Sequence, residues 1–355
     1  MSRLIAFYLP QFYPTPENDE WWEKGFTEWT NVKRAKPLFK DHYQPRIPAD
    51  ELGYYDLRDQ NVRIKQAELA KSAGIEGFCY WHYWFAGRRL LNRVFDEVVE
   101  SGVPDFPFCL CWANHTWYAK RWNPKVRDKI LIEQTYPGMD DYINQFYSML
   151  PAFRDKRYIK VDGRLLYGIF SPTNIPDIEG FTSIWNSLAK EYDLPGFYFF
   201  ALSQGSSNLA NYSPCFDSVV FDPMYDAAYC NRTTFKNKLL TKLNPILNRP
   251  VPMTYDFYSK IAFEFFVQNP KMVPCIIPNF DHSPRSGSRG VIIHGSTPEK
   301  WGQLCEKTLN LVQNRDGEHL VFIKAWNEWG EGNYLEPDYR FGREYLQQLA
   351  RCSNK

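Results

Sequence analysis

The sequence lacks the features that identify several large classes of protein. No stretch approaches the roughly 18 to 20 apolar residues of a membrane-spanning helix. The first twelve residues, MSRLIAFYLPQF, hold only a short apolar run before Pro10 and no small-residue cleavage site. We therefore expect no signal peptide and a cytoplasmic protein. The 42 lysines and arginines nearly balance the 41 aspartates and glutamates, which argues against a dedicated nucleic-acid-binding protein.

Signals for metals and nucleotide cofactors are missing as well. No glycine-rich phosphate loop follows an apolar run, and the chain has no Asp-x-Asp motif of the metal-dependent transferase type. The eight cysteines have no zinc-like spacing, which favours buried free thiols in a reducing compartment. Asp281 and His282 are adjacent, but two residues are too few to predict a metal site. We expect neither a metal nor another cofactor.

Aromatic residues, in contrast, are abundant, with 12 Trp, 23 Tyr and 26 Phe. Aromatic rings often form the floor of sugar-binding sites, because the C–H face of a pyranose packs on a flat apolar surface. A large aromatic core would require the same composition. The count alone does not separate these two interpretations.

Eight short apolar runs alternate mostly with segments of helical periodicity. The runs are residues 4–9, 75–84, 106–112, 165–170, 196–202, 218–222, 273–277 and 319–325. The helical segments are residues 57–73, 90–100, 140–153, 181–192, 261–268, 297–313 and 341–351. Eight such units predict an α/β fold, specifically a (β/α)8 TIM-like barrel that forms a single domain over residues 1–355. A doubly wound sheet is the alternative, but it should carry a phosphate loop.

In a barrel of this kind the carboxyl ends of all eight strands meet at one face, where the active site lies. We expect the segments 13–48, 114–138 and 224–256 to form long loops over that face. Polar and aromatic side chains at the strand ends would then converge: Gln11, Tyr80, His82, Asn114, His115, Asp222, Asn279, Asp281, Glu328 and Glu331.

The strongest catalytic signal lies between residues 319 and 338. An apolar strand ends there in the motif NEWGEG, which places Glu328 and Glu331 three residues apart. Retaining glycosidases use a proton donor and a base or nucleophile about 5 Å apart. A polar loop with two solvated acids is the non-catalytic alternative.

Several neighbours of the two acids are candidate substrate-binding residues. Asn327 could orient a substrate with its amide, and Trp29, Trp112 and Trp329 could either stack on sugars or belong to the core. Glu336 is a third acid or a partner in a loop ion pair, and His82 is a sugar ligand or a core histidine.

The insertion at about 224–256 has a basic, amphipathic character. Residues 227–255 include five lysines and arginines (Arg232, Lys236, Lys238, Lys242 and Arg249) and no acid. Leucines recur there at helical spacing. Such a segment can lie on an anionic membrane, and a helix packed on the barrel with solvated lysines is the alternative.

With these residues in view, the sequence resembles the WbsX family, a group of glycosyltransferases from bacterial surface-polysaccharide clusters. The resemblance runs nearly from end to end. It rests on IAFYLPQFYP at 5–14, NDEWWEKGFTEWTNV at 18–32, HYQPRIP at 42–48, GFCYWHYWF at 77–85, FPFCLCWAN at 106–114, IEQTY at 132–136 and KAWNEWGEGNYLEPD at 324–338. The NEWxEG core and the LEP that follows it are shared with glycoside hydrolase family 99, whose members are retaining endo-mannosidases with a (β/α)8 barrel.

The resemblance implies roles for the two acids. Glu331 would be the general acid/base at the leaving oxygen, and Glu328 would be the base at the sugar 2-hydroxyl, which leads to an anhydro-sugar intermediate. At neutral pH this requires a protonated Glu331 and an ionised Glu328. The sequence departs from its relatives at His115, because most of them have glutamate at that position.

The function implied is glycosyl transfer in O-antigen, capsule or lipopolysaccharide synthesis, at the inner face of the bacterial membrane. The partners would be a sugar donor and a glycan or lipid-linked acceptor. A retaining endo-glycosidase of the family 99 type and a non-catalytic glycan-binding protein are the alternatives.

Overall fold

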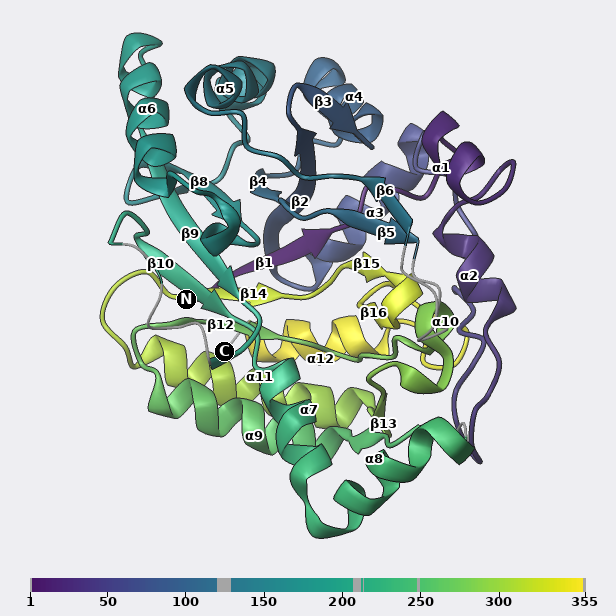
Figure 1. Cartoon of the computed structure of the whole chain (residues 1–355). Helices are drawn as coiled ribbons and strands as arrows, with labels where there is room; N and C mark the ends of the chain where they lie inside the picture. Colours follow the sequence, from purple (N-terminus) through teal and green to yellow (C-terminus); the bar gives the residue numbers. More distant parts are fainter. Residues whose placement is uncertain (1, 120–128, 207–211, 213, 248–249, 354–355) are drawn as a thin grey trace.

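Eight parallel strands close into a barrel in this computed structural model (Figure 1). The structure describes residues 2–119, 129–206, 212, 214–247 and 250–353. In order around the barrel the strands are β1 (Arg3–Tyr8), β2 (Ile75–Phe85), β4 (Phe108–Trp112), β8 (Arg164–Ile169), β9 (Phe197–Ser203), β10 (Ser218–Phe221), β12 (Val273–Ile276) and β14 (Leu320–Ile323). β1 pairs with both β14 and β2, which closes the ring. The predicted (β/α)8 architecture is therefore confirmed.

Seven of the helices correspond to the predicted helical segments, and they surround the barrel (Figure 1). They are α3 (Gln60–Ser72), α4 (Arg93–Ser101), α5 (Met139–Phe153), α6 (Ile178–Glu191), α9 (Tyr255–Gln268), α11 (Pro298–Gln313) and α12 (Glu344–Ser353). Local residues set several helix ends. The Asp59 side chain caps α3, Thr297 caps α11 with Pro298 at its first position, and Gly102 ends α4 in the left-handed conformation.

Alternate residues of each strand point to opposite faces, which divides the core into two layers. Inside the barrel, the ring of Phe7 stacks on Trp81 with centroids 4.7 Å apart, and it also contacts Phe322. Gly168 makes room for this layer, since a Cβ there would lie 2.2 Å from the ring of Phe200. Outside the barrel, Tyr80 packs between the strands and α4, against Phe95.

The insertions after the strands contain more regular structure than expected from the sequence. The predicted loop 13–48 contains α1 (Pro16–Trp21) and α2 (Glu28–Arg34), and the segment 114–138 contains a hairpin of β5 (Trp117–Ala119) and β6 (Lys129–Ile132). The basic insertion forms α7 (Met224–Thr233) and α8 (Phe235–Leu247); its Arg249 lies outside the described residues. α10 (Ser283–Ser286) follows β12 and packs against α2 (Figure 1).

Two further findings concern the chain as a whole. Among the described residues, no helix is both long enough and apolar enough to cross a membrane. None of the eight cysteines, all of which lie among the described residues, forms a disulfide, and five of them are buried.

Candidate active site

A cavity of about 1030 Å³ opens at the carboxyl ends of the barrel strands. Strand ends form part of its wall, and the insertions that contain α1, α2, the β5–β6 hairpin, α7 and α10 form the rest. Four of the candidate residues line it: Gln11, His115, Glu328 and Glu331. Further lining residues include Glu28, Trp81, Tyr83, His282, Arg285 and Lys324.

A tight turn after β14 carries the two acids. Glu328 ends β15 (Asn327–Glu328), and β15 pairs with β16 (Asn333–Tyr334). Glu331 ends the short 3-10 helix η4 (Trp329–Glu331), which connects these two strands. Gly332 completes the turn with φ +57°, a conformation in which glycine has no Cβ penalty. Both acids therefore reach the same cavity from a segment of four residues.

Asn327 anchors this turn to the barrel. Its Oδ1 accepts a hydrogen bond from the backbone N–H of Leu9 at 2.7 Å, and its Nδ2 donates to the Leu9 carbonyl at 3.0 Å. The amide thus continues the pairing of β14 with β1 beyond the end of the sheet. Its functional groups are used within the protein, and it does not line the cavity. The structure therefore does not support the predicted contact of Asn327 with substrate.

Arg285 on α10 connects both acids with a third carboxylate. Its Nη1 donates to Glu331 at 2.7 Å, and its Nη2 donates to Glu328 at 2.8 Å. The same Nη2 donates to Glu28 Oε2 at 2.7 Å, and Nε donates to that oxygen at 3.2 Å. One guanidinium therefore compensates part of the charge of three carboxylates, two from the turn after β14 and one from α2.

The two acids differ in their protonation behaviour. Burial, together with the negative charges of Glu331 and Glu28, raises the pKa of Glu328 to about 8, although Arg285 opposes the shift. Burial would also raise the pKa of Glu331, but the positive charges of Arg285, His282 and Lys324 outweigh it and lower that pKa. In the free protein at neutral pH, Glu328 thus holds a proton and Glu331 is ionised.

This distribution is the reverse of the one that the sequence resemblance implied. The expectation placed the proton on Glu331 because the resemblance implied that this residue is the general acid. The structure places Glu331 beside more cations, with His282 Nε2 at 3.7 Å and Arg285 Nη1 at 2.7 Å. Glu328 is also the more deeply buried side chain, at 9% exposed against 21%. The resemblance implied that the two acids together hold one proton at neutral pH. The structure gives the same total but places this proton on Glu328.

Glu336 belongs to a separate, buried network behind the turn. It accepts hydrogen bonds from Tyr55 at 2.8 Å, from Gln66 at 2.6 Å and from Trp329 at 2.6 Å. Burial raises the pKa of its carboxyl to about 7, while these donors oppose the shift. Glu336 does not line the cavity, so its environment is that of a structural acid and not of a substrate ligand.

Five predicted binding residues point away from the cavity because of strand parity and packing. Tyr80, His82 and Trp112 occupy even positions of β2 and β4, whereas Trp81 and Tyr83 of β2 line the cavity. Trp112 packs on Phe181 of α6. Trp29 is buried against Phe12 and Trp329, and Trp329 stacks on Tyr334 with centroids 3.6 Å apart. These tryptophans form core, so the predicted sugar-stacking role is not supported by their placement.

The remaining predicted polar residues support the site from behind. Asn114 holds the backbone of Ser171, and Asp222 accepts from Lys324 Nζ at 3.1 Å. Asn279 lies 3.5 Å from Arg46. None of the three lines the cavity. Asp222 nevertheless holds Lys324, and Lys324 lines the cavity.

Asp281 connects the 42–48 motif to the acid-bearing turn. Its Oδ2 accepts from His42 Nε2 at 2.8 Å and from Gln44 at 2.6 Å, and its backbone N–H donates to the carbonyl of Glu331 at 2.6 Å. Burial would raise the pKa of Asp281, but the hydrogen bond from His42 and the charge of Arg46 bring it to about 2. It is a buried structural anion that does not line the cavity.

Sequence reasoning missed two central residues. Glu28 lies in the FTEW motif, and its position within a dense aromatic segment was the available signal. Arg285 had no such signal, since it lies in the unremarkable segment SPRS after β12. Only the packing of α10 against η4 and α2 brings it to the acids.

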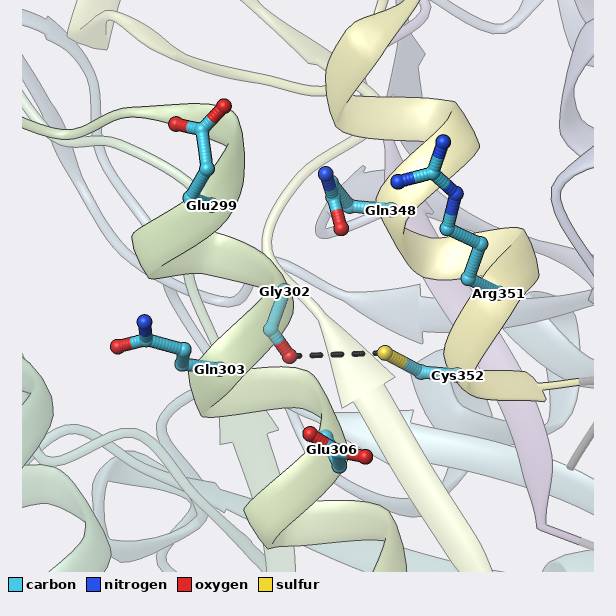
Figure 2. A pocket seen from close by; sticks show the side chains of 7 residues that line it. All are labelled: Glu299, Gly302, Gln303, Glu306, Gln348, Arg351 and Cys352. Atoms are coloured by element: carbon cyan, nitrogen blue, oxygen red, sulfur yellow. Dashed lines mark hydrogen bonds between the residues drawn. The ribbon is translucent and has the colours of Figure 1, made fainter.

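A shallower depression of about 370 Å³ lies on the outer helical layer, between α11 and α12 (Figure 2). Figure 2 shows Cys352 there, hydrogen-bonded to the carbonyl of Gly302 at 3.5 Å. The depression contains none of the candidate residues. The chemistry of the site therefore belongs to the larger cavity.

Similar solved structures share this fold. A protein described as a glycoside hydrolase-like protein aligns with a TM-score of 0.59 and 14% identity, over 99% of this chain and 93% of its own. A GH99 endo-alpha-mannosidase from Bacteroides thetaiotaomicron aligns with a TM-score of 0.54 and 15% identity, over 99% of this chain and 96% of its own. At such identities the similarity establishes the fold alone.

Sequence comparisons identify the family. The model of the family "Glycosyltransferase WbsX" matches residues 4–349. Two proteins from strains of Xanthomonas campestris pv. campestris, both named "Uncharacterized protein WxcX", are 35% identical over 355 residues, which is 99% of this chain and 49% of theirs. The chain thus spans about half the length of the curated relatives it matches. It belongs to the WbsX glycosyltransferase family.

Proposed function

We propose that this WbsX-family chain is a retaining glycosyltransferase of bacterial surface-polysaccharide synthesis, with Glu328 and Glu331 as its catalytic pair. The observation that carries the proposal is the single guanidinium of Arg285, which holds two carboxylates whose pKa values are displaced in opposite directions. Such a pair holds one proton at neutral pH. Retaining transfer by two acids requires one protonated and one ionised carboxyl group.

The reaction proceeds in two steps that conserve protons. In the first, Glu331 donates a proton to the leaving oxygen, Glu328 takes the proton of the sugar 2-hydroxyl, and the 2-oxygen closes on C1 to form an anhydro-sugar. In the second, the acceptor hydroxyl attacks C1 and gives its proton to Glu331, while Glu328 returns its proton to the 2-oxygen. Because the free protein holds the proton on Glu328, substrate binding must first transfer it to Glu331.

A retaining endo-glycosidase is the second candidate, and the proton-holding pair favours it on one point. A sugar alkoxide needs protonation in order to leave, and a general acid supplies this proton. A diphosphate leaves without protonation. The pair therefore suits a donor whose sugar is joined by a glycosidic bond. In this alternative, water replaces the acceptor hydroxyl in the second step.

The acceptor is a glycan or a lipid-linked glycan that is presented at the inner face of the membrane. Side chains at the tip of the α7–α8 insertion support this partner. Lys238, Leu239, Leu240 and Lys242 of α8 are exposed, as is Tyr229 of α7. Tyr225, one turn before Tyr229, lines the cavity. A basic helix with exposed leucines, in the insertion that also contributes Tyr225 to the cavity wall, complements an anionic lipid surface.

A donor and acceptor screen tests the proposal. The purified protein is incubated with a panel of nucleotide sugars and a membrane lipid extract, and in parallel with mannan-type oligosaccharides. Released nucleotide, glycosylated lipid and cleaved oligosaccharide are quantified for the wild type and for Glu331→Gln. Nucleotide release that depends on lipid and is lost in the variant supports the transferase.

The other outcomes separate the alternatives. Cleavage of an oligosaccharide without any nucleotide sugar overturns the transferase and establishes the glycosidase. Equal behaviour of the wild type and Glu331→Gln, with glycan binding retained, overturns both enzymes and leaves a glycan-binding protein.

A further inference from the structure

Glu28 contacts Arg285 beside the two proposed catalytic acids, but the proposed mechanism gives it no role. It is the first residue of α2, it is 8% exposed, and 257 positions separate it from Arg285. A single oxygen, Oε2, accepts from both Nε and Nη2 of Arg285. Nη2 also donates to Glu328. Glu28 and the proposed base therefore share one nitrogen of the same guanidinium.

Gly330 provides the space for this arrangement. It lies between the two acids in the sequence, and a Cβ at this position would be 2.1 Å from Glu28 Oε2 and 3.0 Å from Nε and Nη2 of Arg285. The ion pair therefore packs directly on the backbone of the acid-bearing turn. A side chain larger than hydrogen at residue 330 would displace the pair or the turn.

We propose that Glu28 and Arg285 are positioning residues for the catalytic pair, in which Glu28 holds the guanidinium against Gly330 so that it bridges Glu328 and Glu331. The inference rests on the proposed function, because it assigns these roles relative to the proposed catalytic acids. Without Glu28, the guanidinium is free to turn toward Glu328 and leave Glu331. Without Arg285, three carboxylates face one another with no cation between them.

The charges around the pair determine how each substitution acts. Glu328 faces Arg285, Glu331, Glu28 and the hydroxyl of Tyr83. The cations that face Glu331 are Arg285, Lys324 and, in their protonated forms, His282 and His115. Removal of the Glu28 charge lowers the pKa of Glu328. Removal of the Arg285 charge raises the pKa of both acids, so the two substitutions act in opposite directions.

The first experiment measures pH–rate profiles on the substrate that the screen identifies. In Glu28→Gln we expect the alkaline limb to move to lower pH, and in Arg285→Met we expect both limbs to move to higher pH. Misplacement of the acids should reduce kcat on the order of 100-fold in each, with a smaller change in KM. Glu23→Gln is the matched control, because Glu23 belongs to the same insertion and pairs with Arg34 at the surface.

The second experiment tests a steric effect, because Gly330→Ala itself removes no charged group. Gly330→Ala should reduce kcat in the wild type, and it should reduce kcat less in a Glu28→Ala background, where the crowding oxygen is absent. Equal effects of Gly330→Ala in the two backgrounds would contradict the proposal. A Glu28→Gln variant whose KM rises while its pH profile is unchanged would also overturn it and make Glu28 a substrate ligand.

A third measurement requires no substrate, so it separates this inference from the proposed function. Melting temperatures of Glu28→Gln, Arg285→Met and the double variant form a mutant cycle. Coupling between the two sites is expected, because Glu28 Oε2 accepts two hydrogen bonds from the guanidinium of Arg285. Additive shifts would overturn the positioning role.

If Arg285→Met does not fold, Arg285→Lys replaces it in the kinetic experiment. Lysine retains the charge but not the bridge between the two acids, so both limbs of the pH profile should stay in place while kcat falls.

Discussion

The side-chain amide of Asn327 pairs with the backbone of Leu9 through two hydrogen bonds, of 2.7 and 3.0 Å. This contact joins the turn that follows the last strand of the barrel to the residue that follows the first strand, one position before the first catalytic candidate. It fixes the turn from which Glu328 and Glu331 reach the cavity. The position of both acids therefore depends on Asn327, although Asn327 itself does not line the cavity.

Replacement of Asn327 should destabilise the protein. Asn327→Ala leaves the N–H and C=O groups of Leu9 without partners in a buried position, at a cost of about 1 to 3 kcal/mol for each unsatisfied group. Denaturation in urea should show a lower midpoint. Asn314→Ala is the control, since Asn314 is exposed and its Nδ2 donates to the Asn310 carbonyl at 2.7 Å. An unchanged midpoint in Asn327→Ala would contradict the anchoring role.

Substitution of either catalytic candidate should abolish most of the activity. Glu331→Gln removes the proton donor and Glu328→Gln removes the base, and each should lower kcat by about 10²- to 10⁴-fold. Both are measured with the substrate that the screen identifies. Small nucleophiles such as azide bypass a glycosyl-enzyme intermediate, but the anhydro-sugar mechanism predicts no rescue of Glu328→Gln. Recovery of activity with azide would indicate that Glu328 is a nucleophile.

Stability should decrease as the pH rises from about 5 to 7, and Glu336 should account for part of the decrease. Its folded-state pKa of about 7 lies above the ordinary 4.5, so the folded protein binds a proton that the unfolded chain releases in this range. Through Glu336, the free energy of unfolding should decrease by on the order of 3 kcal/mol over this range. Urea unfolding at a series of pH values measures this slope.

The variant Glu336→Gln should flatten that dependence, since residue 336 no longer titrates. Its absolute stability at pH 5 should fall. The amide oxygen can replace Oε2, which accepts from Tyr55 and Trp329, only if the amide NH2 group faces Nε2 of Gln66, which now donates to Oε1 at 2.6 Å. Glu328, whose pKa is about 8, contributes a decrease of the same sign, so a residual slope should persist up to pH 8. A slope identical to that of the wild type would contradict the assignment to Glu336.

The cavity entrance should bind sugar through exposed aromatic rings. Trp22 lines the cavity, is 47% exposed and packs on Phe26. Trp22→Ala should weaken glycan binding about 3- to 10-fold and leave the melting temperature unchanged, as measured by calorimetry with the glycan substrate. Tyr339→Ala, which removes a 75% exposed ring that does not line the cavity, should have no effect. Equal affinities of the two variants would exclude Trp22 from binding.

The α7–α8 insertion should bind anionic membranes. Co-sedimentation with vesicles that contain phosphatidylglycerol should be stronger than with phosphatidylcholine alone, and it should fall with salt. Leu239→Glu removes a 62% exposed leucine and adds a negative charge, so it should reduce binding. Val267→Glu is the control on α9, where the residue is 51% exposed. Equal sedimentation of both variants would place the contact elsewhere or exclude it.

Much of the fold could be predicted from the sequence because its determinants are local. Each barrel strand is a short apolar run, buried on both faces, and the outer helices have helical periodicity, several with a capping residue such as Asp59 or Thr297. The NEWGEG turn likewise combines a strand end with two glycines and two acids within a few residues. The sequence by itself therefore determined the eight-unit barrel and the position of Glu328 and Glu331 in one turn.

The tertiary structure decided the features that depend on distances through space. Strand parity determined that Trp81 and Tyr83 line the cavity while Tyr80 and His82 face the helices, because a shift of one residue reverses the face. The packing of α2 and α10 brought Glu28 and Arg285 to the acids. The pKa of each acid depends on burial and on the charges around it, so only the folded chain places the proton on Glu328.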